Sequence, residues 1–295
     1  MKKFYFLGMM LIAGLIGYSG CKRTDKNKPA DNIETQDTVE NLVKVFYLVP
    51  SPDDIFGFAE DKSLHFDKYL LNPVENLSKY NDTKTQELNF GIYSADLAYA
   101  AAFGKKQETK DYLQAVKDLS EKISLSAVFN ESLVHRIDNL GTNKDSLIAI
   151  SNDTYFDIIR YLEKTNRINT LSIMAAGGWL ETMYIVVNLI DYDKDKETVQ
   201  KVADQKIIFT NMYKLLEQNL NDKNVKSVYD DMKPLKDLYD QLEIIHKKDI
   251  DDHNVTIDDN KIIVGGDIEI IITKEQFSEL RDVINTIRKK FTLNN

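Results

Sequence analysis

Few residues in this chain can interrupt a helix. The 295 residues include 12 glycines and 5 prolines, the two residue types that most often end helices and open turns. Apolar residues recur instead at spacings of i, i+3, i+4 and i+7, which place them on one face of an α-helix. The sequence therefore predicts a mainly α-helical fold, a multi-helix bundle or an irregular α-solenoid, rather than a sandwich of short strands.

The apolar period divides the chain into helices separated by polar breaks. Ser51-Pro52 and Asn72-Pro73 each join a capping residue to a proline, which is typical of a helix start. Gly104 and Gly141 suit helix ends, where the backbone often turns left-handed. Pro234 is placed to kink the helix that contains it. The period predicts helices at about residues 39–46, 82–103, 107–123, 127–140, 143–164, 169–190, 194–220 and 222–248.

The pattern changes near the C-terminal end of the sequence. Short β-rich runs predict strands at 255–258, 261–264 and 267–272. Asp259-Asn260 and Gly265-Gly266, which join these runs, suit two-residue hairpin turns. The residues that follow, 273–276, read Thr-Lys-Glu-Gln and form a capping box. We therefore expect a short C-terminal β-hairpin or meander and then a final helix to about residue 291.

The stretch from 169 to 190 is the most apolar part of the body, and Glu181 is its only charged residue. It is long enough to span a membrane, but its Asn, Thr and Ser side chains would be unfavourable in hydrocarbon. A central helix of a bundle tolerates such residues. Gly177-Gly178 fits a close approach by a neighbouring backbone.

The single cysteine follows a characteristic N-terminal segment. Two lysines after Met1 precede an uncharged, mostly apolar run of 17 residues, and Ser19-Gly20 stands directly before Cys21. This order resembles the lipobox of bacterial lipoprotein signal peptides, although Tyr18 stands where that family usually has an aliphatic residue. The resemblance implies that the Cys21 sulfur receives a diacylglycerol carrying fatty acids such as palmitate. An uncleaved transmembrane anchor and a plain secretory signal are the alternatives.

The same resemblance sets the expected domain organisation and localisation. Residues 1–20 would be the signal peptide, 21–36 the lipidated cysteine with a flexible tether, and 37–295 a single helical domain. The chain would then lie in the cell envelope on a lipid anchor, with Lys22 favouring the outer membrane.

Charge limits the possible partners. Removing residues 1–20 takes away two of the 38 basic residues and none of the 47 acidic ones, so the formal charge goes from −9 to −11. This excess of negative charge argues against nucleic acid and against a body lying flat on anionic lipid. The membrane is therefore expected as a partner only through the lipid anchor.

Two sequence patterns come close to metal sites. Asp191, Asp193, Asp195 and Glu197 imitate the start of a calcium loop, but lysine stands where the turn needs glycine. Glu243-x-x-His246 has the spacing of a di-iron ligand pair on a helix, but no second such pair exists. Nucleophile, phosphate-loop and dinucleotide motifs are also absent from the sequence. We therefore assign no catalytic residue, no metal and no cofactor.

Six residues of the two most apolar helices form the candidate ligand-binding set. Carboxylates alternate there with aromatic side chains that have polar ends, and a buried carboxylate must be paired or protonated. Such a set either faces a ligand cavity or is a structural network that fixes the helices in register. The set consists of Tyr93, Asp96, Tyr99, Trp179, Glu181 and Tyr184.

Three segments of the body, 50–52, 89–99 and 177–184, resemble a group of uncharacterised helical envelope lipoproteins of bacteria. The resemblance implies a fold and a location but no activity. We therefore expect a non-enzymatic helical module that binds an envelope protein partner or a small ligand, or serves as a scaffold. The alternatives are an enzyme of unrecognised type that uses Asp96 or Glu181, and a structural subunit of an envelope assembly.

Overall fold

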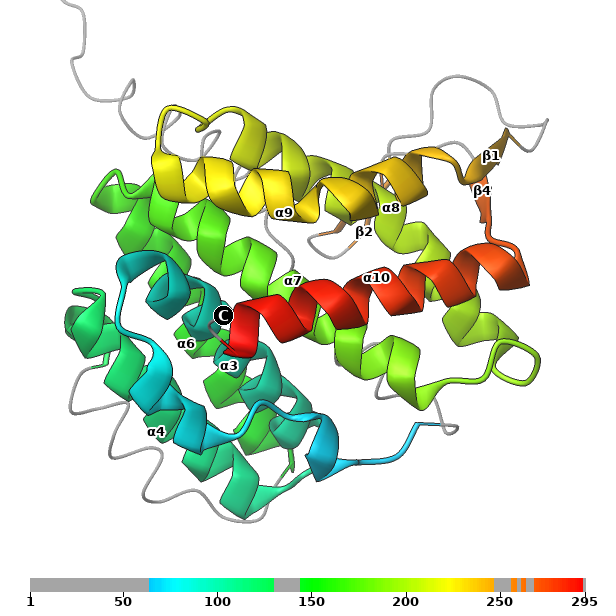
Figure 1. Ribbon diagram of the computed structural model, residues 1–295. Coiled ribbons are helices and arrows are strands. Elements are labelled where there is room, and N and C mark those ends of the chain that lie inside the picture. Colours follow the sequence, from blue (N-terminus) through cyan, green and yellow to red (C-terminus); the bar gives the residue numbers. More distant parts are fainter. Residues whose placement is uncertain (1–63, 130–143, 247–255, 259–260, 264–267, 294–295) are drawn as a thin grey trace, which may run out of the picture. The chain divides into compact units, whose positions relative to one another are not determined.

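The computed structural model describes residues 64–129, 144–246, 256–258, 261–263 and 268–293 (Figure 1). These residues all belong to one compact unit, residues 40–295. The predicted signal peptide, Cys21, the tether, the helix at 39–46 and most of the helix at 127–140 lie outside the described residues.

Helices make up most of the described structure, so the predicted mainly α-helical class is confirmed. Most helix bounds fall within two or three residues of the predicted ones. The helices are η1 (Lys68–Leu70), η2 (Val74–Lys79), α3 (Thr83–Ala102), α4 (Lys106–Lys122), η3 (Ser126–Val128), α6 (Lys144–Lys164), α7 (Ile168–Leu189), α8 (Lys196–Glu217), α9 (Lys223–Asp240) and α10 (Lys274–Leu293).

Local side-chain chemistry accounts for several of these boundaries. Asp82 caps α3 by accepting a hydrogen bond from the Thr85 N–H at 3.1 Å, and Gly104 follows α3 with a φ of 64°. The predicted capping box begins α10: the Gln276 N–H donates to Thr273 Oγ1, and the Thr273 N–H donates to Gln276 Oε1.

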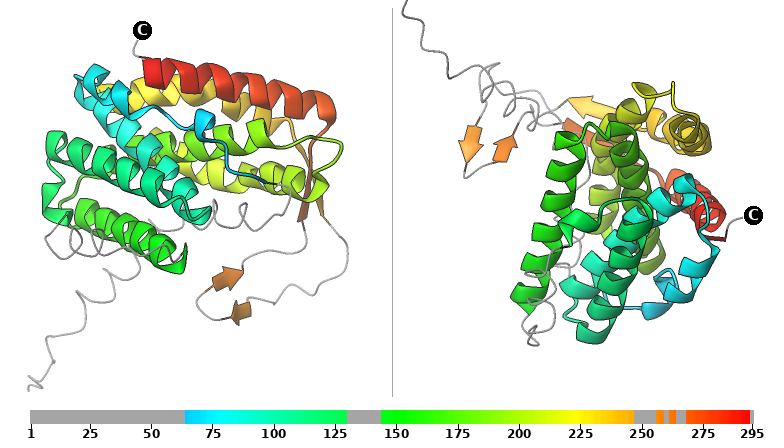
Figure 2. Two further views of the ribbon diagram at one scale, coloured as in Figure 1. Left: turned by 90° about the horizontal axis from the view of Figure 1, so that it is seen from below. Right: turned by 90° about the vertical axis from the view of Figure 1, so that its left-hand side faces the viewer.

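Helix α7 lies at the centre of the described residues. It packs mainly on α3 and also contacts α6, α8, α9 and α10. Figure 2 shows α6 and α10 on opposite sides of this central pair of helices. By length and composition α7 alone among the described helices could cross a membrane, but 83% of its most apolar 18-residue window is buried inside the body. It therefore forms the core of the unit, as the sequence predicts.

Helices α3 and α7 touch through their backbones. A Cβ added to Gly91 would lie 2.0 Å from the Met174 carbonyl oxygen, and one added to Gly177 would lie 2.2 Å from the Leu88 carbonyl oxygen. At Gly178 the nearest atom would be 3.4 Å away, which is ordinary contact. The close backbone approach predicted at Gly177-Gly178 is confirmed. It leaves no room for a side chain at Gly177, whereas Gly178 has room for a methyl group.

The strands form two separate antiparallel pairs. Strands β2 (Thr256–Asp258) and β3 (Lys261–Ile263) pair as the predicted hairpin. Strand β4 (Ile268–Ile271), however, pairs with β1 (Glu243–His246) and not with β3. Strand β4 therefore does not extend the β2–β3 hairpin into a meander, and the predicted turn at Gly265-Gly266 lies outside the described residues.

The helix predicted at 222–248 is too long. Helix α9 continues past Pro234 but ends at Asp240, and residues 243–246 form strand β1. Two adjacent β-branched residues, Ile244 and Ile245, favour a strand, and β4 supplies the backbone hydrogen bonds. The helical interpretation of Glu243-x-x-His246 was therefore wrong.

Candidate functional site

The structure divides the six predicted site residues into three groups. Asp96, Glu181 and Tyr184 surround one arginine of α10, Tyr93 and Tyr99 contact the segment 64–80, and Trp179 lies in a different part of the core.

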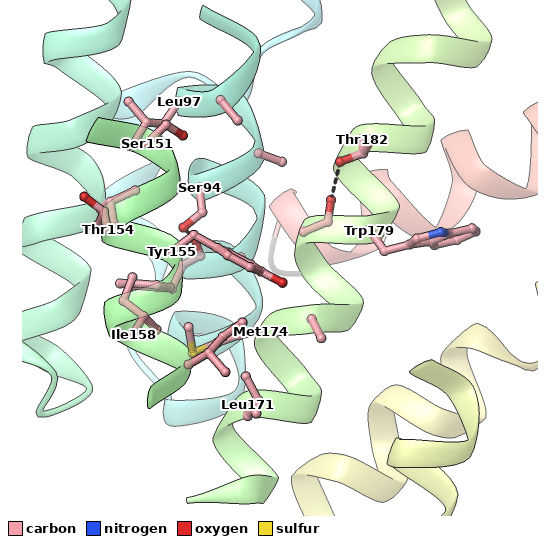
Figure 3. A pocket seen from close by; sticks show the side chains of 18 residues that line it. Ser94, Leu97, Ser151, Thr154, Tyr155, Ile158, Leu171, Met174, Trp179 and Thr182 are labelled. Carbon is pink, nitrogen blue, oxygen red and sulfur yellow. Dashed lines mark hydrogen bonds between the residues drawn. The ribbon is translucent and has the colours of Figure 1, made fainter. Parts of the chain in front are cut away.

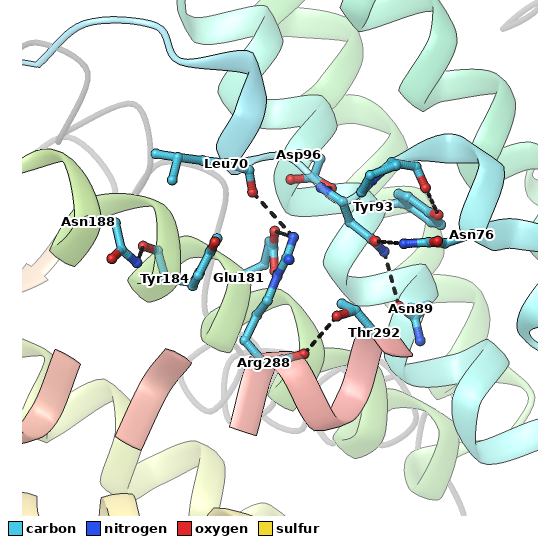
Figure 4. Close-up of polar contacts among 12 residues, drawn as sticks. Leu70, Asn76, Asn89, Tyr93, Asp96, Glu181, Tyr184, Asn188, Arg288 and Thr292 are labelled. Carbon is cyan, nitrogen blue, oxygen red and sulfur yellow. Dashed lines mark hydrogen bonds and ion pairs between the residues drawn. The ribbon is translucent and has the colours of Figure 1, made fainter. Parts of the chain in front are cut away.

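An ion pair joins α7 to α10. Arg288 donates from Nε to Glu181 Oε2 at 3.0 Å and from Nη2 to Glu181 Oε1 at 2.8 Å, a bidentate geometry (Figure 4). The Glu181 side chain is fully buried, and that of Arg288 is 13% exposed. The guanidinium also lies over the Tyr184 ring, 4.3 Å from its centre, and donates to the Leu70 carbonyl oxygen. Sequence reasoning required a partner for Glu181 but could not identify Arg288.

Asp96 is a fully buried carboxyl group beside this ion pair. Its Oδ2 accepts a hydrogen bond from the Asn72 N–H at 3.1 Å, whereas its Oδ1 accepts none. Burial raises the pKa of Asp96 well above its ordinary value, and the nearby Glu181 charge raises it further, while Arg288 acts in the opposite direction. Burial beside the Glu181 charge therefore favours the protonated form of Asp96.

Tyr93 and Tyr99 use their hydroxyl groups inside the protein. The Tyr93 hydroxyl donates to the Pro73 carbonyl oxygen at 2.8 Å. The Tyr99 hydroxyl donates to the His65 carbonyl oxygen at 3.0 Å and accepts from the Asp67 N–H at 2.9 Å. Burial raises the pKa of Tyr99 to about 12, so its proton stays in place. Both tyrosines therefore fix the segment 64–80 against α3.

Asn72, which sequence reasoning treated only as part of a helix start, lies at the centre of this network. Its Nδ2 donates to the Tyr80 hydroxyl at 3.0 Å and to Asn89 Oδ1 at 3.2 Å. Its Oδ1 accepts from Asn76 Nδ2 at 2.8 Å, and its carbonyl oxygen accepts from the Tyr112 hydroxyl. A period of apolar residues does not reveal Asn72, because this residue is polar and its burial serves its hydrogen bonds.

The end of α10 completes the network. Asn89 Nδ2 donates to the Phe291 carbonyl oxygen at 3.0 Å, and the Tyr80 hydroxyl donates to the Thr292 carbonyl oxygen at 3.2 Å. The segment 64–80, α3 and α10 are thus connected by side chains that bond one another. Chemically this arrangement holds elements together, because its acids are buried and engaged with internal partners.

Trp179 is separated from the ion pair. Its Nε1 donates to Gln205 Oε1 at 3.0 Å, and its ring packs against Phe209 and Tyr239. Figure 3 shows this ring on the opposite side of α7 from most of the other labelled side chains. The structure therefore does not bring Trp179 together with Asp96 and Glu181 in one site.

An apolar cavity lies on that opposite side of α7, between α3, α6 and α7 (Figure 3). Its volume is about 70 Å³. Four small residues of α3, namely Gly91, Ser94, Ala95 and Ala98, line it at helical spacing. That stripe of small residues was the sequence signal for the cavity, and sequence analysis missed it. The wall also includes Val116, Thr154, Ile158, Leu171, Met174, Trp179 and Thr182, so Trp179 is the one predicted site residue that belongs to this lining.

A second, polar pocket lies where α3, α7 and α9 begin. The buried carboxyl of Glu87 lies 3.9 Å from Arg167, and burial raises its pKa, opposed by a hydrogen bond with Thr170. Arg167 also donates to the Ile123 carbonyl oxygen, and Asp222 caps α9. Every one of these charged groups is engaged by the protein itself, so this pocket is a weaker ligand site than the apolar cavity.

Metal-binding clusters are not found in the described part of the chain, where no three His, Cys, Asp or Glu side chains lie close enough to hold an ion. In the calcium-like stretch, Asp191 Oδ1 accepts from the Asp193 N–H, and Asp195 Oδ2 accepts from the Asp191 N–H. These carboxylates therefore order the turn between α7 and α8.

Comparison with known proteins adds no family to this description. No family model, no curated protein and no solved structure matches the chain. Its function must be sought in its own geometry.

Proposed function

We propose that this chain is a lipid-anchored protein of the cell envelope whose helical body is a non-enzymatic binding module for a small apolar ligand. Cys21 would receive the lipid, and residues 22–36 would connect it to the body, with Lys22 favouring the outer membrane. The observation on which ligand binding rests is the apolar cavity between α3, α6 and α7.

The cavity has the properties of a binding site for hydrocarbon. Its wall is mostly aliphatic, and burying a CH₂ group in such a place contributes roughly 0.8 kcal/mol. Its volume of about 70 Å³ is smaller than the engineered cavity of about 150 Å³ that binds benzene. The site therefore suits a short apolar group more than a large rigid ring.

The buried acids support binding over catalysis. A general acid or base must reach the substrate directly or through one water molecule. Asp96 and Glu181 are fully buried against Arg288 and the segment 64–80, and neither lines the apolar cavity. An enzyme using these two groups would first have to separate α10 from α7.

Ligand binding is tested by titrating the isotope-labelled body with n-butane and following backbone amide NMR signals. We expect saturable shifts at Ala95 and Gly178, which line the cavity. The amide signal of Asp237, an exposed residue of α9 outside the cavity lining, should move little. The variant Ala98→Val, which narrows the cavity, should lose the shifts while remaining folded. Absence of saturable shifts in the parent protein would refute ligand binding.

The anchor is tested separately by replacing the cysteine. Cys21→Ala should move the protein from the membrane fraction to the soluble fraction, because the acyl chains and not an acidic surface would hold it there. Mass spectrometry of the native N-terminus should show a diacylglycerol on Cys21. Tight membrane association of the variant, or an unmodified sulfur in the parent, would contradict the anchor.

A further inference from the structure

We infer that the ligand of the apolar cavity is a neutral amphiphile, a short hydrocarbon group ending in a hydroxyl or carbonyl, and that Thr154 recognises its polar end. This inference rests on the proposed function and adds the chemical class of the ligand. It starts from Thr154, whose hydroxyl belongs to the cavity wall, is fully buried and has no hydrogen-bond partner among the described residues.

Three hydroxyl groups of the wall can be compared. Ser94 Oγ donates to the Phe90 carbonyl oxygen at 2.7 Å, and Thr182 Oγ1 donates to the Gly178 carbonyl oxygen at 2.9 Å. Both bonds reach back four residues within the helix, which is the usual solution for such a side chain. Thr154 is only 2% exposed, yet its Oγ1 has no hydrogen-bond partner. The Thr154 hydroxyl is therefore shielded from water, and it does not form the hydrogen bond to the carbonyl oxygen four residues earlier that its own helix allows.

A buried hydroxyl without a partner is uncommon in proteins, because it loses the hydrogen bonds that water gave it in the unfolded chain. Thr154 lines the cavity, so a molecule inside the cavity can supply the missing partner. A hydroxyl group can donate one hydrogen bond and accept others. It therefore fits an alcohol, which does both, or a carbonyl, which accepts.

The rest of the wall limits the ligand further. No charged side chain belongs to the cavity lining that the described residues provide. An ionised end would therefore enter without a counter-ion, which is strongly unfavourable in an apolar site. The buried part of the ligand is also short, roughly three or four carbon atoms, since the cavity has about half the volume of one that holds benzene.

The test compares two probes of nearly equal shape, 1-propanol and n-butane, by the same NMR titration. We expect the parent protein to bind 1-propanol with the higher affinity once the greater water solubility of the alcohol has been taken into account. Thr154→Val, which removes the hydroxyl and keeps the shape, should weaken 1-propanol binding about fivefold and leave n-butane binding unchanged. Its melting temperature should not fall, because the hydroxyl bonds nothing in the protein.

Thr182→Val is the matched control. It removes a hydroxyl of the same wall, but one that already bonds Gly178, so the ratio of the two affinities should stay as in the parent. Thr154→Ser retains the hydroxyl and should retain the parent's ratio, which keeps the test valid if the valine variant unfolds. If neither probe binds the parent protein, the proposed function fails. If both bind and Thr154→Val leaves 1-propanol binding intact, only the amphiphile inference is overturned.

Discussion

Asp96 is a carboxyl group whose proton the fold favours. Arg288 contributes one positive charge to the buried site, and Glu181 neutralises it through two hydrogen bonds. A second buried carboxylate would have no counter-charge, and the pKa of Asp96 is accordingly raised.

The retained proton makes stability depend on pH. In the unfolded chain Asp96 loses its proton near its ordinary pKa of 3.8, whereas the folded protein keeps it to higher pH. The folded state therefore binds more protons above that pKa, and the free energy of unfolding falls as pH rises until the folded group also ionises.

Asp96→Asn should remove this dependence. Asparagine keeps an acceptor for the Asn72 N–H and supplies a permanent N–H donor toward Glu181. We expect urea unfolding of the variant to show a smaller loss of stability from about pH 5 to about pH 8 than the parent shows. Asp111→Asn, at an exposed position of α4, is the control and should leave the parent's slope unchanged. If the free energy of unfolding changed equally with pH in all three proteins, a raised pKa of Asp96 would be contradicted.

The sequence predicted that the carboxyl groups of Asp96 and Glu181 need compensation, but it did not identify Arg288 as the group that provides it. Asp96 and Glu181 stand out because a carboxylate in an apolar helix requires compensation, whatever the fold. Arg288 lies on an amphipathic helix with several other basic residues, and nothing local distinguishes it from them. Which arginine is buried depends on how α10 lies against α7, and that is decided by packing across the whole body.

Among the elements, α3 and α7 depend most on one another. Their backbones meet at Gly91 and Gly177, where even a methyl group would overlap a carbonyl oxygen of the other helix. Both helices are weakly amphipathic because they are buried on most sides, so small size at the contact fixes how they pack.

Two neighbouring glycines give a matched test of this contact. Gly177→Ala should lower the free energy of unfolding by about 3 kcal/mol or more, because the added carbon would lie 2.2 Å from the Leu88 carbonyl oxygen. Gly178→Ala should be tolerated or stabilise by up to about 1 kcal/mol, since its surroundings allow a methyl group and alanine favours a helix. Denaturant unfolding measures the stability of both variants. Similar losses of stability would refute the predicted difference between Gly177 and Gly178.

Helix ends could be predicted well because their causes are local. Asp82 and the capping box of residues 273–276 act within three residues of themselves, so their sequence is sufficient. The pairing of β1 with β4 joins residues about 25 positions apart, and a period of a few residues cannot show it. The isoleucines of β1 also satisfied a helical period, which is why the prediction extended α9 too far.

Over the whole described unit, the segment 64–80 and α10 behave as one element. The segment receives hydrogen bonds from α3 and α4, and it contacts α10 at Leu70 and Tyr80. Loss of α10 should therefore loosen the segment at Leu70 and Tyr80.

Arg288→Met tests this connection. The buried Glu181 carboxylate would remain without its cation, so we expect a loss of about 3–5 kcal/mol in the free energy of unfolding at neutral pH. Hydrogen exchange should become faster in residues 64–80 and 274–293 together.

Glu181→Gln is the companion variant, and it should lower the free energy of unfolding less than Arg288→Met does. When Glu181 is neutral, Asp96 can ionise and take over the charge opposite Arg288, because the two already interact. A larger loss for Glu181→Gln than for Arg288→Met would contradict this account, as would faster exchange confined to α10.

The ion pair between Glu181 and Arg288 spans 107 positions of the chain. A ribosome therefore finishes α3 and α7 well before it adds the guanidinium that neutralises them. Until then the Glu181 carboxylate has no counter-charge, and the segment 64–80 lacks its contacts with α10. The body therefore reaches its final shape only when synthesis is almost complete.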